Sequence, residues 1–305
     1  MLVAERQTPA VLVTGLNGFT GRYLTESLRL RGFSVMGFTL DAANDADQIA
    51  CDLTNATAVR AAVQAVQPTH VVHLAAMSFV GHVDAKAFYD VNLFGTLNLL
   101  NALAELEPLP CKVLVASSAN VYGSPGVEVI DERVCPEPVD HYACSKLTME
   151  HMVRTWFDRL PIVLTRPFNY TGVGQDEKFL IPKIVAHFRR RAPFIELGNL
   201  NVARDFSDVR DVVAAYVALL EADVRSDVFN VCSGQAYALQ DVLRMMTEIS
   251  GHAMDVRVNP AFVRANEIPV LRGDPRKLQA RTGHTSRIGL RDTLHWMYTT
   301  SSPAA

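Results

Sequence analysis

Short apolar segments alternate with helical patterns along the first half of this chain, and this alternation restricts the fold more than any other feature. The segments AVLVTG, HVVHLAA, KVLVASS and PIVLTRP have the length and β-branched content of buried strands. Amphipathic patterns at residues 19–31, 57–66, 88–106 and 141–160 predict the helices between them. Fully apolar strands that alternate with helices form a parallel sheet covered on both faces. We therefore expect an α/β fold with a doubly wound parallel sheet.

The alternation loosens after Gly172. Residues 179–191 and 208–222 predict two more amphipathic helices, and DVFNVCS predicts one more strand of the main sheet. From about Tyr237 onward we expect short helices and loops. These changes predict a sheet domain and a smaller C-terminal α/β lid, with the chain crossing between them more than once. The expected bounds are 8–172 and 205–232 for the first domain, and 173–204 and 233–300 for the second.

Composition and charge exclude several classes of function. The chain has 32 acidic and 29 basic residues, so no strong basic surface is expected for nucleic acid or an anionic membrane. Its five cysteines are scattered without CxxC spacing, which favours reduced thiols over a disulfide framework or a metal site. The longest apolar run, VVAAYVALL, is too short to span a bilayer, and MLVAERQTPA does not resemble a signal peptide. We expect a cytoplasmic protein.

A glycine-rich turn, TGLNGFTG, links the first strand to the first helix. Gly15, Gly18 and Gly21 permit a tight turn, close backbone approach to a pyrophosphate, and close packing of helix on strand. This turn predicts a Rossmann-type dinucleotide site, with Asn17, Phe19 and Thr20 as further contacts. An acid at the end of the second strand would select NAD, but Thr39 occupies that position and Asp41 follows it. The choice between NAD and NADP stays open, with NADPH slightly favoured.

The segment HYACSK places Tyr142 and Lys146 four residues apart on a predicted helix, so both side chains lie on one face. A lysine ammonium near a phenol lowers the pKa of the phenol from about 10 towards neutrality. Tyr142 can then exchange a proton with a ketone or alcohol oxygen, and Ser118 can bind the same oxygen. The other interpretation of such a pair is a surface tyrosine beside a solvated lysine.

In this order, TGxxGxxG, SSxxVYG and YxxxK resemble the extended short-chain dehydrogenase/reductase family that acts on nucleotide sugars. The resemblance covers almost the whole chain. It implies that Ser118, Tyr142 and Lys146 are catalytic, and that Lys146 also contacts the nicotinamide ribose. It assigns NAD(P) to the first domain and the nucleotide sugar to the second. Further cofactor contacts implied by the resemblance are Thr39, Asp52, Leu53, Leu74, Ala75, Ala76 and Asn92. Ser117 is interpreted as a core hydroxyl with its hydrogen bonds satisfied.

Asn120 stands where the sugar 4,6-dehydratases of this family carry a glutamate base. An amide has no titratable group for this role, so dehydration is disfavoured. The alternative is that Glu128, Asp131 or Glu132 supplies the base instead.

The resemblance also implies a set of substrate contacts. Asn169 in RPFNYTGVGQ and Arg204 in ARDFSDVRD correspond to residues that bind the substrate diphosphate. The segment RANEIPVLRGDPRKL resembles the GDP-mannose dehydratase branch, with Arg264 and Glu267 at the guanosine and Arg272 as a further diphosphate contact. Ser78 and Asn120 complete the predicted set. The structural alternatives are a salt bridge from Arg204 to Asp205 or Asp208, and a solvated pair of Arg264 and Glu267.

The leading hypothesis is an enzyme that reduces the C4 ketone of GDP-4-keto-6-deoxy-D-mannose, giving GDP-D-rhamnose or GDP-6-deoxy-D-talose. The alternatives are an NAD-dependent nucleotide-sugar 4-epimerase, a 4,6-dehydratase, and a non-catalytic dinucleotide sensor. The family resemblance also predicts a homodimer that forms through the tyrosine-bearing helix and the long helix before the serine strand.

Overall fold

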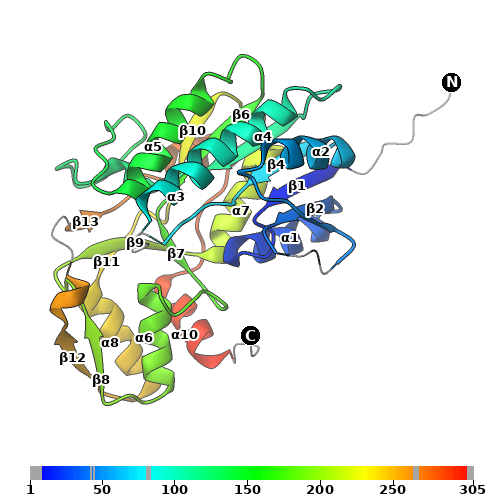
Figure 1. Cartoon of the computed structure of the whole chain (residues 1–305). Helices are drawn as coiled ribbons and strands as arrows, with labels where there is room; N and C mark the ends of the chain where they lie inside the picture. Colours follow the sequence, from blue (N-terminus) through cyan, green and yellow to red (C-terminus); the bar gives the residue numbers. More distant parts are fainter. Residues whose placement is uncertain (1–8, 42, 44, 80–83, 264–267, 301–305) are drawn as a thin grey trace. The chain divides into compact units, whose positions relative to one another are not determined.

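The computed structural model describes residues 9–41, 43, 45–79, 84–263 and 268–300 (Figure 1). The chain divides into two compact units, each described by itself below. Unit 1 comprises Met1–Val121, Pro138–Arg166 and Tyr216–Phe229, and unit 2 comprises Tyr122–Glu137, Pro167–Ala215 and Asn230–Ala305.

A seven-stranded sheet organises the first part of the fold. Its strands, in spatial order, are β10 (Asp227–Val231), β6 (Ile162–Pro167), β5 (Lys112–Ala116), β4 (His70–His73), β1 (Ala10–Thr14), β2 (Ser34–Thr39) and β3 (Gln48–Ala50). The strands from β6 to β3 pair in parallel. Strand order reverses between β1 and β4, which is where a doubly wound sheet opens a ligand-binding crevice at the carboxyl ends of its strands. The predicted Rossmann-type α/β fold is confirmed.

Helices cover the sheet because its strands are apolar on both faces. The helices of this part are α1 (Phe19–Leu30), α2 (Ala56–Val66), α3 (Ala85–Tyr89), the π-helix η1 (Asp90–Gly95), α4 (Thr96–Leu103), the 3₁₀ turn η2 (Ala119–Tyr122), α5 (His141–Arg154) and α7 (Val209–Glu221). On one face, α2, α4 and α5 pack Val63, Leu100 and Met149 against sheet residues such as Leu12 and Val113. Sheet residues that point to the opposite face, such as Val13 and Val72, are also fully buried. The helix α1 lies against β1 and β2.

Two of the predicted helices differ in detail from the observed ones. The expected helix at residues 88–106 begins at Ala85, where Asp84 caps it, and widens into the π-helix η1 before α4 ends at Leu103. The expected helix at residues 141–160 ends at Arg154, and hydrogen-bonded turns follow as far as Leu160. The apolar pattern did not mark either change, because it predicts that a helix is present more reliably than where the helix widens or ends.

Unit 2 contains two small sheets and a layer of helices. β9 (Ala203–Asp208) pairs with β7 (Asn169–Thr171), β11 (Ala236–Ala238) and β13 (Val270–Leu271), and β8 (Phe194–Leu197) pairs with β12 (Asp255–Val258). The helical segments are α6 (Leu180–Arg189), α8 (Leu239–Ser250), η3 (Pro260–Phe262), α9 (Arg276–Thr282) and α10 (Leu290–Thr299). α6, α8 and α10 pack against one another around Phe188, Met246 and Leu294 (Figure 1). The expectation of short helices and loops from about Tyr237 onward omitted the strands β11, β12 and β13. The helix α8 has three turns, with Leu239, Val242 and Met246 as its buried stripe.

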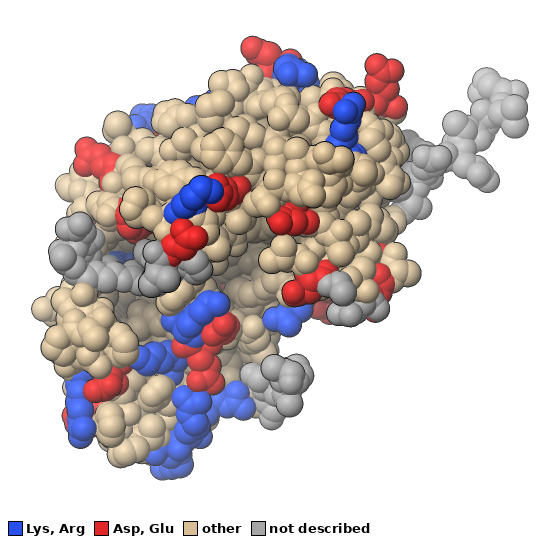
Figure 2. Space-filling model, viewed as in Figure 1, with Lys and Arg blue, Asp and Glu red and all other residues tan. Residues whose placement is uncertain are grey.

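Charged side chains of both signs are interspersed on the face drawn in Figure 2. Among the described residues, no helix has both the length and the apolar character needed to cross a bilayer.

Candidate functional site

The glycine turn after β1 has a shape that only glycine permits. Gly15 has a φ of +73°, and an added Cβ there would lie 3.0 Å from the backbone nitrogen of Ala75. A Cβ on Gly21 would lie 2.3 Å from the carbonyl oxygen of Gly15, so helix and turn can approach only without a side chain. The turn therefore leaves a backbone-lined surface at the carboxyl end of β1, as a pyrophosphate site requires.

The helix after this turn begins differently from its neighbours. Asn55, Asp84 and Asp140 cap the first turns of α2, α3 and α5 with their side chains. α1 begins at Phe19 after Gly18 at the N-cap position, and no side chain makes a cap hydrogen bond there. A helix N-terminus without a side-chain cap, preceded by a glycine turn, suits a phosphate group.

The predicted adenine-side residues lie at the ends of β2 and β3. The hydroxyl of Thr39 is buried and donates to the carbonyl of Asp41 at 2.9 Å. Asp52 is exposed and accepts hydrogen bonds from the amide and hydroxyl of Thr54, whereas Leu53 is buried. These contacts place the three residues at one edge of the sheet and leave the choice between NAD and NADP open.

A buried chain of hydrogen bonds centres on His73, the last residue of β4. Thr96 donates to the carbonyl of Asn92 at 2.7 Å, so its oxygen accepts from Nε2 of His73, which lies 2.8 Å away. Nδ1 of His73 then accepts from Thr14, whose oxygen accepts from the amide of Ala75. Burial, with a smaller effect from the charge of Lys146, lowers the pKa of His73 to about 3. The ring is therefore neutral and ties the segment after β4, with Leu74, Ala75 and Ala76, to β1.

Asn92 lies in the π-helix η1 and is fully buried. Its side chain accepts from the amide of Met77 at 2.9 Å and donates to the carbonyl of Met77 at 3.2 Å. It also donates to Ser145 at 3.0 Å, and Ser145 donates to the carbonyl of Tyr142 at 2.7 Å. Widened turns of this kind often occur at functional sites. The sequence had suggested Asn92 but not Ser145, although Ser145 stands beside the lysine of the YxxxK motif.

Ser118, Tyr142 and Lys146 all lie in unit 1, and each has less than a tenth of its surface exposed. The Lys146 ammonium donates to the carbonyl of Ala116 at 2.9 Å, which fixes it at the end of β5. Tyr142 packs its ring against Phe88, and Ser118 accepts from the amide of Asn120. Because Tyr142 is buried on α5, the alternative of a surface tyrosine beside a solvated lysine is wrong.

Burial also sets the charge state of Lys146. Desolvation lowers the pKa of its ammonium from the ordinary value of 10.5 to about 8, and the nearby charge of Glu150 partly opposes this effect. A lysine with a pKa near neutrality can gain or lose a proton under working conditions.

Of the two residues near Ser118, Asn120 and Ser117, only Ser117 differs from the sequence-based expectation. Asn120 is partly exposed, and its own amide bonds to Ser118. The Ser117 hydroxyl is buried and has no hydrogen-bond partner among the described residues. The interpretation of Ser117 as a satisfied core hydroxyl was therefore wrong.

The predicted diphosphate contacts belong to unit 2. Arg204 donates to the carbonyls of Ala203 and Pro269, and Arg272 donates to the carbonyl of Gly234 and to Glu128. Asn169 begins β7 and is exposed. Asp208 pairs with Arg210.

The remaining predicted substrate residues fall elsewhere. Ser78 is exposed in unit 1, and Arg264 and Glu267 lie outside the described residues. The sequence did not identify a cavity of about 220 Å³ in unit 2, which is lined by Asn199, Leu200, Asn201, Val202 and Pro269. The two asparagines of GNLN were the available signal. Pro269 connects this cavity to Arg204, which donates to its carbonyl.

The parallel sheet, the glycine turn and the buried tyrosine–lysine pair are typical of NAD(P)-dependent enzymes of the extended short-chain dehydrogenase/reductase class. Within that class, residues 12–297 match the family model described as GDP-mannose 4,6 dehydratase. The chain belongs to this family.

One relative and two solved structures are similar to this chain over most of its length. The chain is 37% identical to GDP-6-deoxy-D-talose 4-dehydrogenase of Aggregatibacter actinomycetemcomitans, over 94% of this chain and 96% of the relative. It is similar to the structure of RMD from Pseudomonas aeruginosa complexed with NADPH, with 29% identity, a TM-score of 0.85, and coverage of 96% and 98%. A Burkholderia cenocepacia J2315 structure, provisionally described as an epimerase, has 47% identity, a TM-score of 0.89, and coverage of 96% and 98%.

Proposed function

We propose that this protein reduces the C4 ketone of a GDP-linked 4-keto-6-deoxy sugar with hydride from NAD(P)H. The observation that carries the proposal is the buried group of Ser118, Tyr142 and Lys146 in unit 1, beside an amide at Asn120 in place of an acid. The group supplies proton transfer to an oxygen atom, and Asn120 cannot act as the base of a dehydratase.

Each residue has a distinct role in this reaction. The reduced nicotinamide supplies hydride to the ketone carbon. Tyr142 donates its hydroxyl proton to the ketone oxygen, Ser118 hydrogen-bonds the same oxygen, and Lys146 stabilises the resulting phenolate. A proton from solvent restores Tyr142, so one ketone, one NAD(P)H and one proton give one alcohol and one NAD(P)⁺.

The arginines and the cavity of unit 2 support a substrate that carries a nucleoside diphosphate group. Arg204 and Arg272 are suited to the diphosphate because guanidinium groups bind phosphate oxygens through paired hydrogen bonds. The cavity at Asn199–Val202 is smaller than the pockets of about 300–1,000 Å³ that enclose whole drug-sized ligands, and its amide groups suit a nucleobase. Two relatives, GDP-6-deoxy-D-talose 4-dehydrogenase and GDP-6-deoxy-D-mannose reductase, are named for GDP-linked sugars, which favours guanine. Identity of 37% to the talose enzyme, against 30% to GDP-6-deoxy-D-mannose reductase of Pseudomonas aeruginosa, favours GDP-6-deoxy-D-talose over GDP-D-rhamnose.

A nucleotide-sugar 4-epimerase is the second candidate, and the Burkholderia cenocepacia structure is the observation that favours it. An epimerase uses the same three side chains but retains its NAD and consumes no reduced cofactor.

The deciding experiment mixes purified protein with GDP-4-keto-6-deoxy-D-mannose and NADPH or NADH, and follows the loss of reduced-nicotinamide absorbance. Oxidation with the keto sugar, but not with GDP-mannose or UDP-glucose, supports the reductase. NMR of the product then gives the configuration at C4. Absence of oxidation with either coenzyme, together with bound NAD in the purified protein, supports the epimerase.

The pKa of Lys146 predicts how the reaction depends on pH. The pKa of Lys146 is about 8 in the folded protein, below its unfolded value of 10.5. In the folded protein the ammonium is therefore present below pH 8 and is lost above it. We expect kcat/KM for NADPH to fall above about pH 8, approaching tenfold per pH unit. The same shift makes folding release a proton between about pH 8 and 10.5, so this residue alone makes stability rise with pH in that window.

The control for this prediction is Lys146→Arg, which stays charged throughout. The variant should be slower but should lack the fall above pH 8. A wild-type profile that stays flat from pH 7 to about 9.5 contradicts the assignment.

We also propose a cytoplasmic homodimer that uses NADPH. The five cysteines are free thiols, and exposed Phe94 in η1 and Met152 in α5 offer apolar surface on the two predicted interface helices. Sedimentation analysis of the wild type and of Met152→Glu tests the dimer. A monomeric wild type, or an unchanged sedimentation coefficient in the variant, contradicts this interface.

A further inference from the structure

Asp205 is a buried carboxylate with no place in the proposed chemistry. It lies in β9, beside Arg204, and none of its surface is exposed. Oδ1 accepts from the amide of Ser233 at 2.9 Å and from its hydroxyl at 2.6 Å, and Oδ2 accepts from the amides of Gly234 at 2.9 Å and Gly273 at 3.3 Å. Burial raises the pKa of this carboxyl, and the hydrogen bonds oppose the shift. Burial of a carboxylate is costly unless hydrogen bonds satisfy its oxygens, and here four donors do so.

These hydrogen bonds hold two segments that fix Arg272: the one that contains it and the one whose carbonyl accepts from its guanidinium. Gly273 follows Arg272 directly in the chain, and its amide bonds to Asp205. Gly234 donates its amide to Asp205 and offers its carbonyl to Nε of Arg272 at 2.8 Å. Asp205 therefore anchors both the backbone that carries Arg272 and the carbonyl that orients its guanidinium.

The same strand connects this anchor to the second arginine. Arg204 precedes Asp205, and its backbone pairs with Leu271 of β13, the residue before Arg272. Arg204 thus lies in β9 and Arg272 directly follows the neighbouring strand β13, and the hydrogen bond from Gly273 to Asp205 links the two segments.

We propose that Asp205 is a positioning residue that holds Arg204 and Arg272 as a preorganised clamp for the substrate diphosphate. This inference rests on the proposed function, in which these arginines bind that diphosphate. It predicts that loss of the Asp205 charge weakens nucleotide binding and leaves the chemical step and cofactor binding intact.

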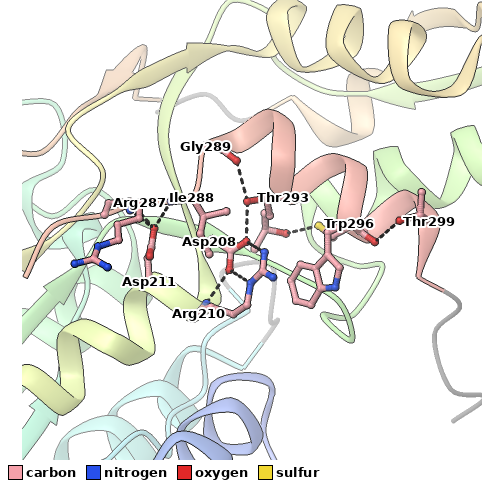
Figure 3. Close-up of polar contacts among 12 residues, drawn as sticks. Asp208, Arg210, Asp211, Arg287, Ile288, Gly289, Thr293, Trp296 and Thr299 are labelled. Carbon is pink, nitrogen blue, oxygen red and sulfur yellow. Dashed lines mark hydrogen bonds and ion pairs between the residues drawn. The ribbon is translucent and has the colours of Figure 1, made fainter.

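Asp211 provides a matched control in the same unit (Figure 3). Its carboxylate is also buried and accepts from one hydroxyl and two backbone amides, those of Ser286, Arg287 and Ile288. These bonds fasten the segment before α10 and orient no residue of the proposed clamp. Asp205→Asn and Asp211→Asn should therefore lose similar stability and differ in nucleotide binding.

The test compares steady-state kinetics and calorimetric binding of GDP, with UDP and dTDP as further probes. For Asp205→Asn we expect KM for the keto sugar and Kd for GDP to rise about ten- to hundredfold, with kcat and KM for NADPH changed less than about threefold. Asp211→Asn should leave both nucleotide constants within about twofold of wild type. Ser233→Ala removes only one donor to Asp205, so it should raise KM for the keto sugar and Kd for GDP by less. It tests the same inference if Asp205→Asn does not fold.

The outcomes separate this inference from the proposed function. Unchanged GDP binding in Asp205→Asn and Ser233→Ala overturns the inference and leaves the reductase intact. An equal weakening in Asp205→Asn and Asp211→Asn overturns it too, because the effect would then be general destabilisation. GDP binding that depends on Asp205, without reduction of the keto sugar, supports the clamp and rejects the reductase. Failure of the wild type to bind any of the three nucleotides rejects both.

Discussion

Replacing Tyr142 by Phe is expected to lower kcat for reduction by about 10²–10⁴-fold, the usual contribution of a general acid. Phe keeps the ring that packs against Phe88, so the fold is preserved. Only the hydroxyl proton is lost, and no other described group in the site takes its place in the proposed mechanism. Stopped-flow measurement of NADPH oxidation with the keto sugar gives the rate, and NADPH binding by fluorescence should stay unchanged.

The matched control is Tyr89→Phe. Tyr89 lies in α3, and its hydroxyl is 3.2 Å from Nδ1 of His141, the residue before Tyr142. Its loss removes one partly exposed hydrogen bond and should change kcat less than about threefold. Substantial turnover in Tyr142→Phe, or an equal loss in Tyr89→Phe, contradicts the proposed role of Tyr142.

The second large effect is on stability, at the buried ion pair between Glu150 and Arg166. The pair joins α5 to β6 through three hydrogen bonds of 2.6–3.2 Å, and each side chain is at most 3% exposed. Glu150→Ala leaves a buried guanidinium without its counterion, so the free energy of unfolding should fall by about 3–5 kcal/mol. Urea denaturation followed by circular dichroism measures this change.

Two controls define the cause of that loss. Glu248→Ala removes exposed pairs with Arg244 and Arg291 and should cost about 1 kcal/mol or less. The double variant Glu150→Met with Arg166→Met should recover much of the stability, because no buried charge then remains. A single variant as stable as the wild type would show that the buried charge is not what makes this pair costly to break.

Much of unit 1 could be predicted from local sequence. The strands are apolar on both faces, and the glycine spacing directly reflects the close approach of Gly15 and Gly21. Tyr142 and Lys146 were identifiable because four residues on a helix bring two side chains to one face. Asn120 was informative because an amide lacks the acid that dehydration needs.

Unit 2 was less predictable because its contacts join segments that are distant in the chain. The bonds of Asp205 to Ser233 and Gly273 cross 28 and 68 residues. The cavity lined by residues 199–202 and Pro269 also joins segments that are distant in the chain. No local pattern encodes such partners.

The sequence by itself determined the parallel sheet, the dinucleotide turn and the residue types available for proton transfer, since these depend on spacing along one or two elements. Only the tertiary structure decided their electrostatics. Burial at the end of β5 brings the pKa of Lys146 to about 8, and enclosure between Thr14 and Thr96 keeps His73 neutral. Desolvation depends on every atom packed around a group, so it exists only once the chain has folded.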